Sequence, residues 1–369
     1  MDGADFIIIG GGIAGLSAAA RLAAHGKVIV LEAEEALGYH SSGRSVSFSH
    51  YGIGNEVVRA LTRYSRPFFE EQPEGFCETR IAELFPSLYF AEEEALPLLA
   101  ALETNMAALV DTLEPLDAAA LNRVCPILKT GPGAALRGFL DPTGLKLDAD
   151  ALLQSFARAL RARGGEIRLG GRVGTIERRG NAWVVDDAVS APILINAAGA
   201  WCDRIAALAG LTPLGLEPKR RTIIAIDPGT DMTGWPFVHS AAGDFYMLAE
   251  AGRLLVSPVD EVPDDPCDAQ PDDYDIALAA DRLEHYTTLQ VSRIAHRWSG
   301  LRTFTRDRTP TAGFAPDAPG FFWLCGQGGY GLQTAPAMAA AVEALVTGGA
   351  WPFADLKPEQ IAPARLLAT

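Results

Sequence analysis

The hydrophobic pattern at the start of the chain predicts a strand, a glycine-rich turn, a helix and a second strand. Apolar residues run without interruption over Phe6–Ile9, as they do in a parallel strand that is covered on both faces. Three glycines follow, then a stretch rich in Ala and Leu over Ala14–Ala24 that is typical of a helix, and an apolar run over Val28–Leu31. This β-α-β unit predicts a doubly wound sheet.

The pattern changes in the middle of the chain and returns to the first style at its end. An amphipathic helix is expected over 150–163, followed by short strands at 166–169, 175–178, 183–185 and 193–196. Between Thr222 and Val256, β-branched and aromatic residues recur in short runs that indicate an antiparallel sheet. A strand over Phe321–Leu324, a glycine-rich turn and a long Ala-rich helix then follow. A discontinuous first domain and a second, inserted domain are therefore expected.

Composition narrows the class of protein. The 369 residues include 31 Lys and Arg and 46 Asp and Glu, a net charge of −15, which would repel a polyanion at long range, so no nucleic-acid partner is expected. The five cysteines are odd in number and lack a C-x-x-C spacing, which fits free thiols in a reducing compartment and gives no support for a metal site. The acidic start is unlike a signal peptide, and no apolar run reaches the about 18 residues of a membrane span. We expect a cytoplasmic protein without a transmembrane segment.

The turn after the first strand carries a dinucleotide fingerprint. Gly10, Gly12 and Gly15 match G-x-G-x-x-G between strand and helix, and Glu32, followed by Ala33, ends the next strand 17 residues later. Gly10 permits the tight turn, Gly12 lets the backbone approach a pyrophosphate, and Gly15 lets the helix pack on the strand. Phosphates would lie at the helix N-terminus. Glu32 would accept hydrogen bonds from the ribose and repel a 2′-phosphate, which disfavours NADP.

Two further glycine-rich turns favour FAD over NAD. Residues 196–201 follow one buried strand, and residues 326–331 follow another and precede a helix. Small residues at several strand ends let the backbone approach a long, enclosed ligand closely.

Other short motifs accompany these turns, at residues 38–45, 141–144, 196–203, 218–221, 298–302 and 327–334. Together they resemble the D-amino-acid oxidase superfamily of flavoenzymes, and within it the branch of bacterial D-arginine dehydrogenase and glycine oxidase. The resemblance covers nearly the whole chain. It implies an α/β FAD-binding domain of Rossmann type (1–80, 145–215 and 305–369) and an α+β substrate domain with a mainly antiparallel sheet (81–144 and 216–304).

The resemblance also implies which residues hold a non-covalent FAD. Ile13 and Ala14 belong to the glycine turn, and Val173 would meet the adenine through its backbone. The pyrophosphate and flavin would be lined by Ser41, Ser42, Arg44, Ser45 and Val46. The adenosine would be flanked by Ala198, Gly199 and Trp201, and the isoalloxazine by Gly300, Gly328, Gly329, Tyr330, Gly331, Leu332 and Gln333. Cys325 is interpreted as a buried thiol rather than a flavin attachment point.

Substrate residues follow from the same resemblance. Arg302 aligns with the arginine that binds the substrate carboxylate by two parallel hydrogen bonds, Tyr246 with the tyrosine that supports it, and Arg221 with a second arginine near the pocket; Gly329 lies at the flavin beside them. His50 matches an active-site His only after a two-residue shift.

Without the shift, Phe48 and Ile53 take the two places of the His and Tyr in that loop. Both alignments stay open.

The implied activity is oxidative deamination of a D-amino acid by hydride transfer from Cα to flavin N5, giving an imine that hydrolyses to a 2-oxo acid and ammonia. The expected electron acceptor is a quinone or a carrier, with oxygen as the alternative. Oxidation of glycine, sarcosine or a cyclic secondary amine is the second hypothesis. A flavin-holding electron-transfer or structural subunit without substrate chemistry is the third.

The substrate side chain is where the sequence departs from D-arginine dehydrogenase. Ungapped alignment places Ser87 where that enzyme carries an acid, and Glu83 would lie on the same strand face ~13 Å away. A buried cation without its partner is costly. We therefore expect neutral or apolar D-amino acids in place of D-Arg or D-Lys, with Ser87 lining the side-chain pocket.

Overall fold

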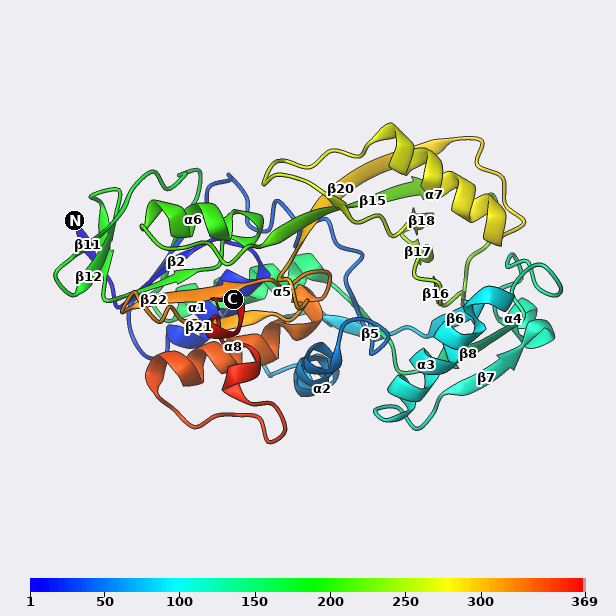
Figure 1. Cartoon of the computed structure of the whole chain (residues 1–369), viewed down its shortest axis with the longest axis horizontal. Helices are drawn as coiled ribbons and strands as arrows, with labels where there is room; N and C mark the ends of the chain where they lie inside the picture. Colours follow the sequence, from blue (N-terminus) through cyan, green and yellow to red (C-terminus); the bar gives the residue numbers. More distant parts are fainter. Residues whose placement is uncertain (368–369) are drawn as a thin grey trace.

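The computed structural model describes residues 1–367, and its first large sheet holds the predicted β-α-β unit (Figure 1). The strand order is β10-β3-β2-β14-β22-β21. All neighbours are parallel except β21 and β22. The strands are β2 (Phe6–Ile9), β3 (Val28–Leu31), β10 (Glu166–Arg168), β14 (Ile193–Asn196), β21 (Thr311–Phe314) and β22 (Phe321–Cys325).

Both faces of this sheet are covered, which is why β2 has no polar residue and is fully buried. On one face, Ile8 and Ile195 pack against apolar residues of α1 (Ile13–Leu22) and α8 (Gly331–Thr347). On the other face, Ile7 and Trp323 pack against α6 (Cys202–Leu208) and a small sheet. The strands of that sheet are β1 (Asp2–Gly3), β11 (Ile176–Arg179), β12 (Ala182–Val185) and β13 (Val189–Ala191).

The second large sheet has the order β19-β15-β18-β17-β16-β6-β8-β7, and β20 also pairs with β15. Its neighbours are antiparallel except β16 and β6. The strands are β6 (Ser87–Ala91), β7 (Glu114–Asp117), β8 (Arg137–Asp141), β15 (Glu217–Ile226), β16 (Phe237–Ser240), β17 (Tyr246–Glu250), β18 (Arg253–Ser257), β19 (Val262–Pro263) and β20 (Ile294–Phe304). It is accompanied by α3 (Leu96–Ala107), α4 (Ala118–Val124) and α7 (Asp273–Tyr286).

A third, three-stranded sheet joins segments far apart in the sequence: β4 (Phe48–Ser49), β9 (Leu145–Leu147) and β5 (Ala82–Leu84). The remaining elements are α2 (Glu56–Glu70), α5 (Ala149–Ala162), α9 (Ala364–Leu367) and the short 3₁₀ helices η1 (Glu93–Ala95), η2 (Gly199–Trp201) and η3 (Pro358–Gln360). None of the helices within residues 1–367 is both long and apolar enough to span a membrane.

The predicted fold class is confirmed: a Rossmann-type α/β sheet is joined to a mainly antiparallel sheet. Predicted elements form with shifts of one or two residues at their ends; the helix expected over Ala14–Ala24 begins at Ile13 and ends at Leu22. Hydrophobic periodicity locates the middle of an element better than its ends. The predicted domain boundaries stay a prediction.

Candidate active site

The glycine turn between β2 and α1 has room for no side chain at two of its positions. Gly10 has φ +112°, and a Cβ there would lie 2.4 Å from the Ala197 carbonyl oxygen. A Cβ on Gly15 would lie 2.0 Å from the carbonyl oxygen of Gly10. A Cβ on Gly12 would meet only Ser42 Oγ, at 3.3 Å, so this position faces open space, as the approach of a pyrophosphate requires.

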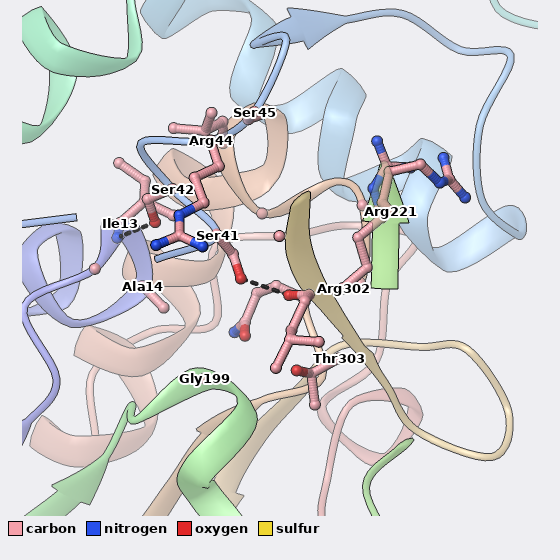
Figure 2. Close-up of a pocket in the computed structure, with 18 of the residues that line it drawn as sticks. Ile13, Ala14, Ser41, Ser42, Arg44, Ser45, Gly199, Arg221, Arg302 and Thr303 are labelled. Carbon is pink, nitrogen blue, oxygen red and sulfur yellow. Dashed lines mark hydrogen bonds between the residues drawn. The ribbon is translucent and has the colours of Figure 1, made fainter. Parts of the chain in front are cut away.

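The loop that carries Ser41 and Ser42 closes over the N-terminus of α1 (Figure 2). Ser42 Oγ accepts a hydrogen bond from the Ile13 backbone N–H at 3.0 Å, and the Ser41 hydroxyl donates to the Leu301 carbonyl oxygen on β20. Arg44 Nη1 donates to the carbonyl oxygens of Ala269 and Ser299, and its guanidinium pairs with Asp268. The charge of Arg44 is therefore neutralised by the protein, and the side chain ties the loop to the second sheet.

A cavity of about 610 Å³ lies at the carboxyl ends of β2, β3 and β14. Of the residues predicted for the adenosine half, it is lined by Gly10, Gly12, Glu32, Ala33, Ser41, Ser42, Val173, Ala198, Gly199 and Trp201. Glu32 Oε2 accepts a hydrogen bond from Gly11 N at 2.6 Å and Oε1 accepts one from Glu34 N at 2.9 Å. A carboxylate has further lone pairs, so Glu32 can hold the turn and still accept from a ribose hydroxyl.

A second cavity, of about 130 Å³, continues from the first, since both are lined by Gly12, Ser41, Ser42 and Gly199. Its other predicted residues are Ile13, Ala14, Arg44, Ser45, Gly300, Gly328, Gly329, Gly331 and Leu332 (Figure 2 shows several of them). Gly331 begins α8, so the positive end of that helix faces the cavity. The residues fit FAD, with adenosine at Glu32 and the flavin toward α8.

A third cavity, of about 430 Å³, adjoins the flavin end. Ser45, Arg221, Arg302, Gly329 and Leu332 line both. We name it the substrate cavity. Its other lining residues are Val46, Phe48, His50, Gly52, Ile53, Gly54, Arg59, Tyr89, Leu98, Ala101, Leu102, Asn105, Phe237, His239, Ser240, Ala241, Gly243, Phe245, Tyr246, Val259 and Gln333.

Arg302, which lines both cavities, and Tyr246, which lines the substrate cavity, have polar groups without a partner. No carboxylate within residues 1–367 lies within 4 Å of the Arg302 guanidinium, and a Cβ on Gly329 would lie 2.6 Å from Arg302 Nη1. The Tyr246 hydroxyl is buried and has no hydrogen-bond partner in the described chain. Buried donors are normally paired, so the arrangement indicates a site for an anion such as a carboxylate.

Arg221 lies beside Arg302 but is held by the protein. Its Nε donates to the Asp260 carbonyl oxygen at 2.8 Å, and its Nη2 lies 3.5 Å from Glu261 Oε1. Burial, helped by the charge of Arg302, lowers the pKa of Arg221 to about 10. Arg221 therefore adds positive potential to the junction while two of its five N–H donors are engaged by Asp260 and Glu261.

A wall of rings lines the substrate cavity. His50 Nδ1 and the Tyr89 hydroxyl are hydrogen-bonded at 2.6 Å, and the His239 ring lies 5.0 Å from the His50 ring and 4.0 Å from that of Phe237. Burial, helped by Arg302, lowers the pKa of His50 to about 3; burial, helped by His50, lowers the pKa of His239 well below its usual value. Both imidazoles are therefore neutral at ordinary pH.

His50, Phe48 and Ile53 all line the substrate cavity, so each of the two alignments of the loop stays a prediction. Tyr51 does not; it is buried elsewhere, under the guanidinium of Arg66.

Some predicted cofactor residues lie apart from the flavin cavity. Val46 and Gln333 line the substrate cavity, and Gly15 lies beneath the turn, packed on Gly10. Tyr330 lines none of the three cavities; its ring packs near Phe304 and its hydroxyl donates to the Arg308 carbonyl oxygen. Cys325 is fully buried at the end of β22 and lines none of them either, which fits a flavin held without a covalent bond.

The placement of Ser87 and Glu83 was predicted wrongly. They do not share a strand, because β5 ends at Leu84 and β6 begins at Ser87, in another sheet. Ser87 is fully buried and does not line the substrate cavity; Tyr89 is the residue of β6 that does. Glu83 is exposed and pairs in register with Lys146. The prediction assumed one continuous strand from Glu83 to Ser87, but Phe85 and Pro86 belong to no strand.

Sequence reasoning missed His239, Tyr89, Phe237 and the face of α3 that lines the cavity. The alternation in β16, with Phe237 and His239 on one face, was a usable signal, as was the helical spacing of Leu98, Ala101, Leu102 and Asn105.

Fold and cleft together define a dinucleotide-dependent oxidoreductase of the flavoenzyme class.

Comparisons with known proteins agree with this assignment to the flavoenzymes. A family model described as FAD dependent oxidoreductase (DAO) matches residues 5–345. Glycine oxidase of Pseudomonas putida is 28% identical over 95% of this chain and 96% of that protein. FAD-dependent oxidoreductase domain-containing protein 1 of Bos taurus is 30% identical, but over 46% of this chain and only 38% of its own length. The crystal structure of L-proline dehydrogenase from P. horikoshii superposes with a TM-score of 0.85 at 20% identity, over 99% of this chain and 98% of that one.

The chain therefore belongs to the DAO family of FAD-dependent oxidoreductases, and its cofactor is FAD. The predicted superfamily and cofactor are confirmed. Kinship with the D-arginine dehydrogenase branch stays a prediction.

Proposed function

We propose that the protein catalyses the oxidative deamination of a D-amino acid. The observation that carries this proposal is that the substrate cavity is lined both by Arg302, which pairs with no carboxylate of residues 1–367 and also lines the flavin cavity, and by the unpartnered hydroxyl of Tyr246. A planar guanidinium and a hydroxyl together suit the carboxylate of an amino acid. The Pseudomonas putida relative, which is named a glycine oxidase, supports an amino group as the site of oxidation.

When bound, FAD supplies at N5 an acceptor for hydride from the substrate Cα, and water hydrolyses the released imine to a 2-oxo acid and ammonia. The chain's contribution is to position and desolvate. Arg302 would hold the carboxylate by two parallel hydrogen bonds, and Tyr246 would donate a third. Three fixed points, the carboxylate, the Cα–H and the side chain, select one enantiomer.

The neutral state of His50 and His239 also matters for the substrate amine. Only the uncharged amine has a lone pair to stabilise the developing imine. A wall of neutral imidazoles beside two arginines disfavours the ammonium form in the cavity.

Oxidation of glycine, sarcosine or a cyclic secondary amine is the second candidate, favoured by the name of the Pseudomonas putida relative. Glycine has no side chain, however, and the substrate cavity of about 430 Å³ is far larger than glycine needs. A passive flavin-holding subunit would have no use for an unpartnered Arg302.

The proposal is tested by mixing the FAD-loaded protein with candidate substrates under anaerobic conditions. The candidates are matched D and L amino acids, glycine, sarcosine, proline and 2-hydroxy acids. We expect loss of the visible absorbance of the oxidised flavin with D-amino acids and not with their L-enantiomers. Reduction by glycine or proline alone would favour the second candidate, and reduction by none of the amines would overturn both.

We further propose that the electron acceptor is a quinone or carrier rather than oxygen. Mixing the reduced protein with air-saturated buffer should give slow reoxidation, and a soluble quinone should give fast reoxidation. Formation of one peroxide per turnover in air would contradict this.

A further inference from the structure

Helix α3 presents one face to the substrate cavity. Leu98, Ala101, Leu102 and Asn105 line the cavity, and their spacing of three, one and three residues places them on a single helical face. Only Leu99 and Met106 of this helix are buried. Leu98 is 54% exposed, although the helix borders a deep cavity. The exposed Leu98 and the partly buried Leu102 therefore contribute apolar surface to the wall of the cavity.

The cavity around this face contains no acidic residue. Among its lining residues are Arg59, Arg221 and Arg302 but no Asp or Glu, in a chain whose net charge is −15. A cationic side chain would therefore be desolvated without a counter-ion. Arg221 is held by Asp260 and Glu261, and one nitrogen of Arg59 donates to the Gly54 carbonyl oxygen at 2.7 Å, so a preference for an acidic side chain would depend on Arg59 alone.

The walls that accompany α3 are aromatic. Phe48 and Phe237, whose ring centroids lie 4.6 Å apart, and Tyr89 line the cavity with it. The two imidazoles in the wall are neutral. Apolar area removed from water is the main source of affinity that such a surface can offer.

We infer that the α3 face formed by Leu98, Ala101 and Leu102 binds the substrate side chain and selects long, uncharged, apolar side chains, such as those of leucine, methionine and phenylalanine. The inference rests on the proposed function, because it takes Arg302 as the point from which the side chain extends. Under this inference the side chains of leucine, methionine and phenylalanine reach α3, and the methyl group of alanine does not.

The first test removes the apolar face. In the double variant Leu98→Ala and Leu102→Ala, kcat/KM for D-Leu and D-Phe should fall by ~10-fold or more, while kcat/KM for D-Ala should change by less than ~2-fold. The matched control is Leu84→Ala, since Leu84 is 73% exposed and lines no part of the cavity. An equal loss for D-Ala and D-Leu, or a parent enzyme that prefers D-Glu or D-Arg, would overturn the inference.

The second test adds a charge. Leu102→Glu should raise the ratio of kcat/KM for D-Arg to that for D-Leu by ~10-fold or more, because it supplies the missing counter-ion. Ala100→Glu is the control: it places the same charge on the same helix, at an exposed position that does not line the cavity. Equal ratios in the two variants would show that the α3 face does not contact the side chain.

A binding measurement separates this inference from the proposed function. Acetate, butyrate, hexanoate and phenylacetate should perturb the flavin spectrum with affinity that rises with apolar size in the parent and not in the double variant. If affinity rises with apolar size in this way while no amino acid reduces the flavin, the proposed deamination is refuted and the binding role of the α3 face is supported. If amino acids reduce the flavin and neither turnover nor binding depends on side-chain length, the α3 site fails and the function stands.

Discussion

The FAD cleft and the substrate cavity meet at Arg302, yet they are built in different ways. The cleft is shaped by main chain: at Gly10 and Gly15 a Cβ would lie 2.4 Å and 2.0 Å from carbonyl oxygens. The substrate cavity is shaped by side chains from α3, β6, β16 and β17 and the loop before α2. A backbone cradle tolerates few sequences, whereas a side-chain wall can be rebuilt without changing the fold. Cofactor identity and substrate choice are therefore separable properties of this molecule.

Breaking the cradle should have the largest effect. Gly12→Val places a branched side chain where the pyrophosphate passes, so the purified variant should contain no FAD, while the parent releases FAD on denaturation. The flavin absorbance relative to that of protein measures this, and circular dichroism reports whether the variant is folded. Gly3→Val is the control, because a Cβ at Gly3 meets nothing within 4 Å. A folded Gly12→Val protein with full flavin content, or a parent that takes up NAD and ignores FAD, would contradict the assignment.

Replacing Arg302, where the flavin and substrate cavities meet, should lower activity without affecting FAD binding. Arg302→Met should lower kcat/KM by about two orders of magnitude, since an unpaired buried carboxylate costs ~3 kcal/mol, and FAD content should stay near normal. Arg63→Met is a matched control, because Arg63 pairs with Asp355 away from the cavities. Equal rates of flavin reduction in the Arg302 variant and the parent would refute the carboxylate site.

The most gradual expected effect concerns the imidazole wall, because it is spread over several pH units. The folded-state pKa of His50 is about 3, below the ordinary 6.5, so between these pH values the unfolded chain binds a proton that the folded chain does not. Stability should therefore be lost as pH falls through this window, by at most ~1.4 kcal/mol per pH unit. His50→Asn should flatten the pH dependence of the unfolding midpoint, and His296→Asn, at an exposed site outside the three cavities, should not. An unchanged slope in His50→Asn would show that the residue is not buried as a neutral ring.

The same contrast explains what the sequence could predict. The glycine turn, Glu32 and Arg302 lie in short motifs whose spacing specifies local geometry, and the structure places them around one cleft. His239 and Leu102 carry no motif; they meet only because β16 and β6 pair in parallel and α3 packs beside them. The error at Ser87 has a related origin. Two residues outside any strand separate β5 from β6, and the two strands belong to different sheets. A period-two pattern of apolar residues does not reveal such a break.

The loop after β3 is bonded to β20 from both sides: Ser41 donates to Leu301, Arg44 to Ser299, and Trp298 Nε1 donates back to the Arg44 carbonyl oxygen at 3.0 Å. The position of the strand that carries Arg302 is thus fixed by hydrogen bonds to the loop predicted to cover the pyrophosphate. Binding free energies of two ligands coupled through one element are reciprocal. If FAD raises the affinity for a carboxylate by some factor through ordering this loop, a bound carboxylate must raise the affinity for FAD by the same factor. The substrate-bound enzyme would then have the lower dissociation constant for FAD.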